Sequence, residues 1–119
     1  MQGNLFNVNF HTHGTLSANA IYRYVMPIDA TLIRVDTIGT ANVSSALTIG
    51  TPADADGYIK SFTPGANNTV VTKDRGDFDG DLNPDTAECP HIAKDTVVLL
   101  TFTHASASNV AINLTFLEG

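Results

Sequence analysis

Oxygen-bearing side chains crowd one stretch of this chain, DRGDFDGDLNPD, at residues 74–85. Counted from Asp77, they recur at the first, third, fifth, seventh, ninth and twelfth places: Asp77, Asp79, Asp81, Asn83, Asp85 and Glu88. Calcium takes six to eight hard oxygen ligands, and this spacing resembles an EF-hand loop. That loop requires glycine at the sixth place for a sharp turn, but this chain has Leu82 there, and no helical pattern flanks the stretch. The sequence therefore favours a solvated acidic loop, with a calcium site as the alternative.

The tripeptide Arg75-Gly76-Asp77 lies within the same stretch and matches an integrin-binding signature. Integrin binding would require the tripeptide to be exposed, which we expect of so polar a segment. Three defined residues also recur by chance, and nothing else in the sequence indicates an extracellular animal protein. We therefore interpret the tripeptide as part of the acidic loop.

The histidines and the cysteine are the other candidates for metal ligands or nucleophiles. His11 and His13 lie on one face of a predicted strand, a spacing found in some metal sites, but a site needs at least a third ligand. Only His91, His104 and distant carboxylates could supply it, so a surface or interface pair is favoured. Cys89 is the only cysteine, which excludes an intrachain disulfide and favours a small loop residue.

No catalytic constellation is recognisable in the sequence. There is no nucleophile elbow, and no glycine-rich phosphate loop follows a predicted strand. The Asn-x-Ser/Thr sequons are what a chain rich in asparagine and threonine produces by chance. We predict that the protein is not an enzyme and that it has no catalytic, cofactor-binding or metal-binding residues.

The elements that position these residues are predicted to be strands, because the dominant period of the chain is two. Near the start, Phe6, Val8 and Phe10 alternate with polar residues, and residues 109–119 alternate in the same way. Eight strands are predicted, at residues 4–14, 20–26, 30–38, 46–50, 57–62, 68–73, 95–104 and 109–119. The strand at 95–104 is apolar on both faces, which indicates a central strand or one covered by a partner. The predicted fold is all-β: a single antiparallel β-sandwich or jelly-roll-like domain over residues 1–119, with little or no helix.

Composition limits the partners. The net charge is −6 and no basic run is present, which argues against binding to nucleic acid or to an anionic membrane. The start of the chain has neither a basic region nor a long apolar run, so we expect no signal peptide and synthesis in a cytoplasm. Only 15% of residues are charged, which weakly favours faces that contact other proteins.

Three segments together resemble the small head decoration, or capsid cement, proteins of tailed bacteriophages. They are MPIDATLIRVDTIG, in which a strand follows a Pro-x-Asp corner, LTIGTPADADGYI, and IAKDTVVLLTFT with a closing VAINLTFLE strand. The resembling runs, residues 24–63 and 91–119, cover more than half of the chain, and the acidic stretch lies outside them.

The resemblance implies a homotrimer on the outer capsid surface of the virion. Its partner there would be the major capsid protein, bound at three-fold or quasi-three-fold positions so that the shell is stabilised. Two other functions stay open on the sequence. One is a receptor- or glycan-binding sandwich of a phage tail or fibre, although the chain has no tryptophan to stack on sugars. The other is a calcium-dependent adhesion module built around residues 77–88.

Overall fold

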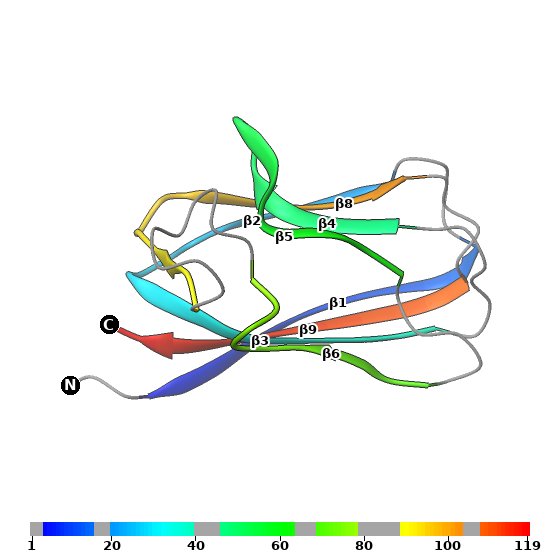
Figure 1. The fold of residues 1–119 in the computed structure, drawn as a ribbon, viewed down its shortest axis with the longest axis horizontal. Helices are drawn as coiled ribbons and strands as arrows, with labels where there is room; N and C mark the ends of the chain where they lie inside the picture. The colour runs from blue at the N-terminus through cyan, green and yellow to red at the C-terminus, as the bar shows by residue number, and fades with distance from the viewer. Residues whose placement is uncertain (1–3, 16–19, 40–45, 64–68, 79–88, 104–107) are drawn as a thin grey trace.

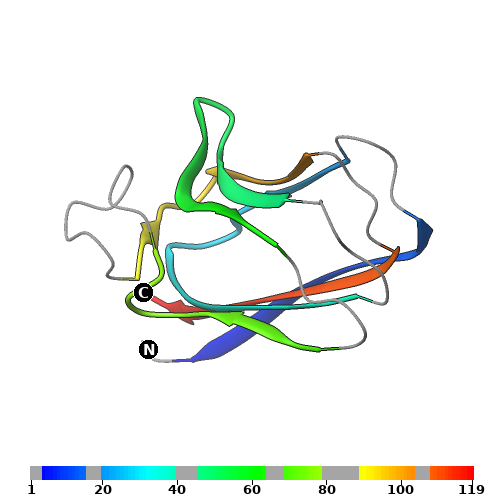
Figure 2. The same ribbon diagram turned by 45° about the vertical axis from the view of Figure 1, so that its right-hand side comes forward.

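The computed structural model describes residues 4–15, 20–39, 46–63, 69–78, 89–103 and 108–119. Across these residues the chain forms two facing antiparallel sheets, visible as two layers in Figures 1 and 2. The strands are β1 (Leu5–Thr15), β2 (Ile21–Val25), β3 (Ala30–Ile38), β4 (Ala46–Thr51), β5 (Asp54–Phe62), β6 (Val71–Lys73), β7 (His91–Ile92), β8 (Val97–Thr103) and β9 (Ser108–Glu118). Sheet A has the order β1-β9-β3-β6, with β7 also paired to β3, and sheet B has the order β2-β8-β4-β5.

The strand order is that of a jelly roll. With the two-residue β7 set aside, the first strand pairs with the last, the second with the last but one, the third with the sixth and the fourth with the fifth. The chain is thus one long antiparallel ribbon, wound so that successive strand pairs lie alternately in sheet A and in sheet B. The predicted fold class is therefore confirmed.

The central strand of sheet B shows why these sequences form strands. In β8, Val98, Leu100 and Phe102 are fully buried between the sheets, whereas Val97 and Leu99 are half-buried on the outer side. The strand lies between β2 and β4, so its backbone groups are paired on both sides. The two-sided apolar pattern thus did indicate a central strand.

In sheet A, β3 occupies the predicted residues 30–38, and a bulge changes which residues face inward. Leu32 pairs with Phe116 and Arg34 with Thr115, so Ile33 is the extra residue. Before the bulge the even-numbered Leu32 is buried, and after it the odd-numbered Val35 is buried. The bulge therefore brings Arg34 to the outer face of sheet A.

The structure differs from the predicted strands in two main details. The strands predicted at residues 46–50 and 57–62 leave residues 51–56 as a connecting turn, but the turn is only Pro52 and Ala53, and β5 already begins at Asp54. The tight turn is possible because Gly50 has no side chain: a Cβ there would lie 2.1 Å from the Asp54 carbonyl oxygen. The second detail is β7, which pairs Ile92 with Ala30; two residues are too few to produce a visible period.

The core lies between the sheets, and aromatic rings close its side nearest β1 and β2. Phe6 stacks on Phe116 with ring centroids 5.1 Å apart, and Phe10 lies 5.3 Å from Tyr22. Tyr24 also stacks on Phe116, at 6.4 Å. Such pairs add about 0.5–1.5 kcal/mol each beyond their buried area. These rings therefore join the first two strands to the buried centre.

The buried Tyr58 hydroxyl makes the stability of the fold depend on pH in the alkaline range. This side chain is 4% exposed, and burial raises the pKa of its phenol above the ordinary value of 10.0. Since the folded state holds the proton more tightly than the unfolded chain, the stabilisation is complete below pH 10 and is lost as pH rises through the folded pKa. We expect the melting temperature to fall more steeply above pH 10 in the wild type than in Tyr58→Phe, measured by circular dichroism. Equal slopes in the two proteins would contradict this expectation, and Tyr24→Phe serves as a control for tyrosine loss.

Candidate interaction surface

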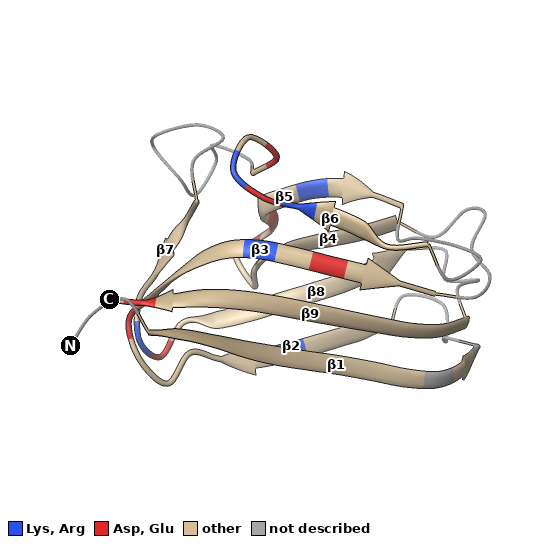
Figure 3. Cartoon of the chain, turned by 90° about the horizontal axis from the view of Figure 1, so that it is seen from below, with Lys and Arg blue, Asp and Glu red and all other residues tan. Residues whose placement is uncertain are grey.

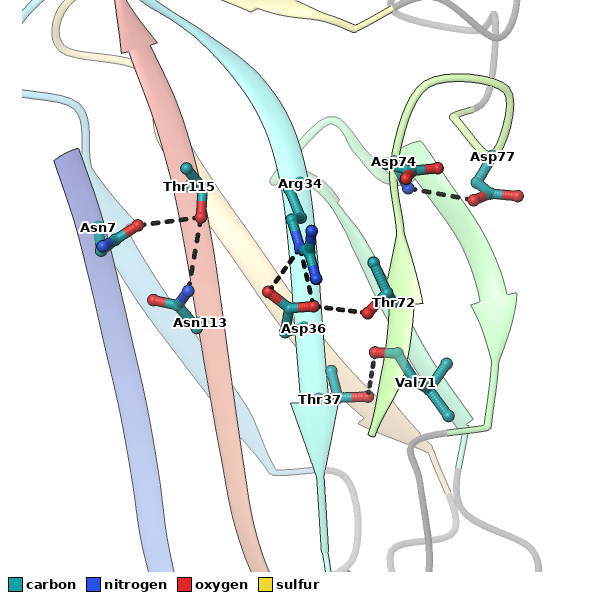
Figure 4. Close-up of polar contacts among 10 residues, drawn as sticks. All are labelled: Asn7, Arg34, Asp36, Thr37, Val71, Thr72, Asp74, Asp77, Asn113 and Thr115. Carbon is teal, nitrogen blue, oxygen red and sulfur yellow. Dashed lines mark hydrogen bonds and ion pairs between the residues drawn. The ribbon is translucent and has the colours of Figure 1, made fainter. Parts of the chain in front are cut away.

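The acidic stretch begins with a tight turn that uses its own carboxylate. The amide of Asp77 donates to the Asp74 carbonyl oxygen at 2.9 Å. In return, the amide of Asp74 donates to Asp77 Oδ2 at 3.1 Å, as Figure 4 shows. Gly76, with φ of 102°, supplies the positive dihedral that this turn requires. Phe78, 4% exposed, then fixes the turn to the core.

This turn bears on the integrin-binding and the calcium-binding interpretations of the acidic stretch. Arg75, Gly76 and Asp77 are all exposed, as integrin binding would require, but the Asp77 carboxylate is already engaged with the turn backbone. The other five oxygen-bearing residues of the calcium pattern, at 79, 81, 83, 85 and 88, lie outside the described residues. Within the described ranges, no three histidine, cysteine or acidic side chains are grouped as a metal site. The calcium alternative stays a prediction.

The histidines do not converge where they can be placed. His11 is exposed on β1, and His91 is exposed on β7, paired with Thr31. Thr31 lies opposite Leu117, which pairs with Leu5, so the two histidines sit at positions about six residues apart along the sheet. At the rise of an antiparallel strand this separation is roughly 20 Å, far beyond a shared ion. His104 and the side chain of His13 lie outside what the structure describes.

The outer face of sheet A carries a row of polar contacts across its strands (Figure 4). The Arg34 Nε–H donates to both carboxylate oxygens of Asp36 at 3.0 Å, and the Thr72 hydroxyl donates to Asp36 Oδ1 at 2.6 Å. On the neighbouring strands the Thr115 hydroxyl donates to Asn7 Oδ1 at 2.9 Å. Because the Arg34 side chain is half exposed, its ion pair contributes little to stability. The contacts instead hold these side chains flat on the sheet.

Beside this polar row the same face is hollowed. A cavity of about 260 Å³ opens over Ala111, whose register partners are His11 on β1 and Ile38 on β3. Val70, 55% exposed, forms part of the rim, and Asn113 lies at the polar end. The hollow exists because a methyl group stands between two larger side chains. It has the size of an apolar side chain or two, rather than of a cofactor.

Charge is distributed unevenly over this face (Figure 3). The segment LFNVNFHTHGT of β1 contains no Lys, Arg, Asp or Glu, and the only charged residue of β9 is Glu118 at its end. The charges that Figure 3 shows on the strands of sheet A otherwise lie on β3 and β6, at Arg34, Asp36 and Lys73. A partner could therefore cover the β1–β9 half without removing water from any ion pair.

In sheet B, the half formed by β2 and β8 is also poor in charge, because Arg23 is the only charged residue of these two strands. On β2, Ile21 is 42% and Val25 is 56% exposed, and they flank the exposed Arg23. Their register partners on β8 include Val97 and Leu99, both half-buried. Apolar side chains are thus left uncovered on both faces of the sandwich, but the hollow is on sheet A.

The tyrosines that a glycan-binding site could use are engaged in the core. Tyr22 and Tyr24 pack against the buried cluster, and the Tyr22 hydroxyl is hydrogen-bonded to the Thr12 hydroxyl. Tyr58 is buried. Sugar stacking needs an exposed ring, so none of these three provides the platform that the glycan-binding alternative requires.

The fold defines the chain as a jelly-roll β-sandwich. It is similar to one chain of a solved structure described as the cyanophage Pam1 capsid asymmetric unit, with a TM-score of 0.60 and 13% sequence identity. The likeness covers 99% of this chain and 87% of that chain, so it extends over almost the whole of both. At this identity the comparison shows a shared fold. No protein-family model and no curated protein matches the sequence. The described residues include no helix that could span a membrane.

The hollow over Ala111 was not foreseen from the sequence. An alanine in an outward position of a strand gives no signal by itself, since a depression requires large residues beside it on the neighbouring strands. Those neighbours, His11 and Ile38, are distant in sequence and are set by the register. The only available signal was the uncharged character of residues 4–15 and 108–117.

Proposed function

We propose that this protein is a capsid decoration protein: a homotrimer that binds the major capsid protein on the outer surface of a phage head at three-fold or quasi-three-fold positions. The observation that carries the proposal is the end-to-end likeness to a chain of a phage capsid asymmetric unit. That chain is of similar length, so the match is to a small polypeptide as a whole and not to a part of a large one. The resemblance of residues 24–63 and 91–119 to decoration proteins supports the same function.

The surface chemistry supports a role that depends on contact area. A decoration protein stabilises the assembled shell because it binds the shell and not its dissociated subunits. Each stable contact needs on the order of 1,000 Å² of buried surface and no reactive group. The hollowed, weakly charged face of sheet A offers such area, with exposed Val70 and half-buried Ile38 beside the hollow. A trimer would close by repeating one heterologous contact around a three-fold axis.

Three measurements test the proposal. The first is the mass of the purified protein by multi-angle light scattering, where we expect a trimer or a multiple of a trimer. The second is co-sedimentation of the protein with phage heads that lack it. The third is the temperature at which heads with and without the protein release DNA, which the protein should raise. A protein that is monomeric and does not sediment with heads would end the proposal.

A charge placed in the hollow should separate binding from folding. Ala111→Arg puts a cation between His11 and Ile38 on the outer face, where the core is not disturbed. We expect head binding to fall at least tenfold, while the melting temperature of the free protein stays within about 3 °C, as for surface substitutions in general. The matched control is Ala93→Arg, at an exposed alanine between β7 and β8, which should bind as the wild type does. Undiminished binding of Ala111→Arg to heads that bind the wild type would place the contact elsewhere.

A further inference from the structure

Strand β1 leaves one of its edges without a partner among the described residues. It pairs with β9 on one side and stands at the end of sheet A, so its other side faces outward (Figure 3). The pairing with β9 is regular from Leu5 to Thr12 and is then interrupted by a bulge that contains Gly14, with φ of 83°. The regular part offers an extended backbone for a further strand.

The hydrogen bonds identify which backbone groups point outward. The carbonyl oxygen of Asn4 accepts a hydrogen bond from the Glu118 amide at 2.9 Å, so Asn4 is bonded to the β9 side. In an antiparallel pair, residues alternate between those that bond to the partner and those that point both groups away from it. The even-numbered residues therefore bond to β9. The N–H and C=O groups directed to the open edge belong to Leu5, Asn7, Asn9 and His11.

This edge lacks the features that keep edge strands apart. Natural edges are protected by charged side chains, proline, bulges or shortness. From Leu5 to Thr12, β1 has no charge, no proline and no bulge. The neighbouring edge of sheet B differs, because β2 has only five residues and carries Arg23. β1 is thus the edge best suited to accept another strand.

We propose that β1 pairs with β1 of a second copy of this chain, antiparallel across a two-fold axis at Val8. In this register Asn7 lies opposite Asn9 of the other copy and Leu5 lies opposite His11. All four outward-directed residues then exchange both of their backbone hydrogen bonds. The two A sheets become one continuous sheet.

The side chains suit this register. Opposed residues share parity, so the inward Phe6 of one copy meets the inward Phe10 of the other beneath the joined sheet. On the outer side, asparagine meets asparagine, and the amides can bond across the junction. No like charges are opposed, because β1 carries none. A two-fold axis at this edge makes the interface self-complementary, because every contact occurs twice. An unrelated extended segment would lack this symmetry, so its contacts would not be repeated.

The contact is independent of the proposed function, because it needs only this chain. It is a two-fold contact through an edge, whereas the proposed trimer is a ring. Neighbouring three-fold positions on an icosahedral shell are related by two-fold axes, so one chain could make both contacts. Head binding tests the first proposal, and cross-linking of the purified protein tests the second.

The test uses a disulfide at the axis. In the Cys89→Ala background, Val8→Cys places two thiols in a directly opposed, non-hydrogen-bonded pair, with Cα atoms about 4.5 Å apart. That separation lies within the range of disulfides. Under mild oxidation at micromolar concentration, we expect a disulfide-linked dimer on non-reducing gels. The control is Thr12→Cys in the same background. In this register the two cysteines at position 12 would be roughly 25 Å apart, so this variant should form dimers at least tenfold more slowly.

A second pair of variants keeps the test decisive if the inward Val8 site does not tolerate cysteine. Asn7→Cys with Asn9→Cys, both on the exposed outer side, should link between copies in the same register. Adding Asn9→Pro to the Val8→Cys protein removes an outward N–H that β9 does not use, and should reduce linking at least tenfold without loss of folded signal by circular dichroism. The proposal would be overturned if Val8→Cys formed disulfide-linked dimers no faster than Thr12→Cys and the variant with Asn7→Cys and Asn9→Cys formed none. So would linking that Asn9→Pro leaves unchanged.

Discussion

Phe116→Ala is expected to remove a large part of the stability of this domain. The Phe116 side chain is 0% exposed. Its ring stacks on Phe6 and on Tyr24, with ring centroids 5.1 Å and 6.4 Å apart. Deleting a buried phenylalanine costs about 3–5 kcal/mol, because transfer energy is lost and a cavity remains. Small domains are stable by about 5–15 kcal/mol, so a loss of this size is a substantial share of the total. The measurement is the free energy of unfolding in urea.

The control for Phe116→Ala is Leu5→Ala, at the end of the same strand pair. Leu5 is 62% exposed, so its truncation should change the free energy of unfolding by under about 0.5 kcal/mol. Ile112→Ala and Leu114→Ala, both inward-facing on β9, should each cost about 2–5 kcal/mol. A Phe116→Ala loss below that of Leu114→Ala would show that β1 and β2 do not depend on the aromatic cluster.

Gly50→Ala is expected to destabilise the domain clearly, although it adds only one methyl group. The new Cβ would lie 2.1 Å from the Asp54 carbonyl oxygen and 2.6 Å from the Ala55 carbonyl carbon. Both are backbone atoms of β5, so they can move only if the pairing of β4 with β5 is distorted. Overpacking of this kind costs about 1–3 kcal/mol. Thermal unfolding by calorimetry should show the loss, and exchange of β5 amides should accelerate.

Gly14→Ala provides a matched comparison for Gly50→Ala. At Gly14 an added Cβ meets nothing within 4 Å, but φ is 83°, so alanine there carries only backbone strain of about 1 kcal/mol. A loss at position 50 no greater than at position 14 would mean that the β4–β5 hairpin adjusts freely. The two substitutions thus distinguish a steric cost from a conformational one.

The strands could be predicted from the sequence to the extent that one face of each is apolar. β3 was predicted at its observed bounds, and the central position of β8 followed from its two apolar faces. The start of β5 was missed because Asp54 and Asp56 are typical turn residues. Their place in the strand depends on how closely Gly50 lets the two backbones approach, which is a property of the pair of strands.

The candidate surface could not be predicted for a related reason. The hollow over Ala111 joins three strands that are distant in sequence, and the polar contacts around Asp36 join two. Periodicity assigns a residue to a face but does not identify its neighbour on the next strand. The uncharged character of β1 was visible in the sequence, but its position at the edge of sheet A was not.

The pairing of β1 with β9 also sets when this molecule can fold during its synthesis. Leu5 meets Leu117, so the first strand made must wait for the last. At ordinary translation speeds this delay is on the order of ten seconds. A nascent chain stalled before β9 would leave both Phe6 and the even-numbered backbone groups of β1 uncovered beside the ribosome. We expect this domain to reach its native state only after β9 has left the ribosome, and to rely on chaperones in proportion to that interval.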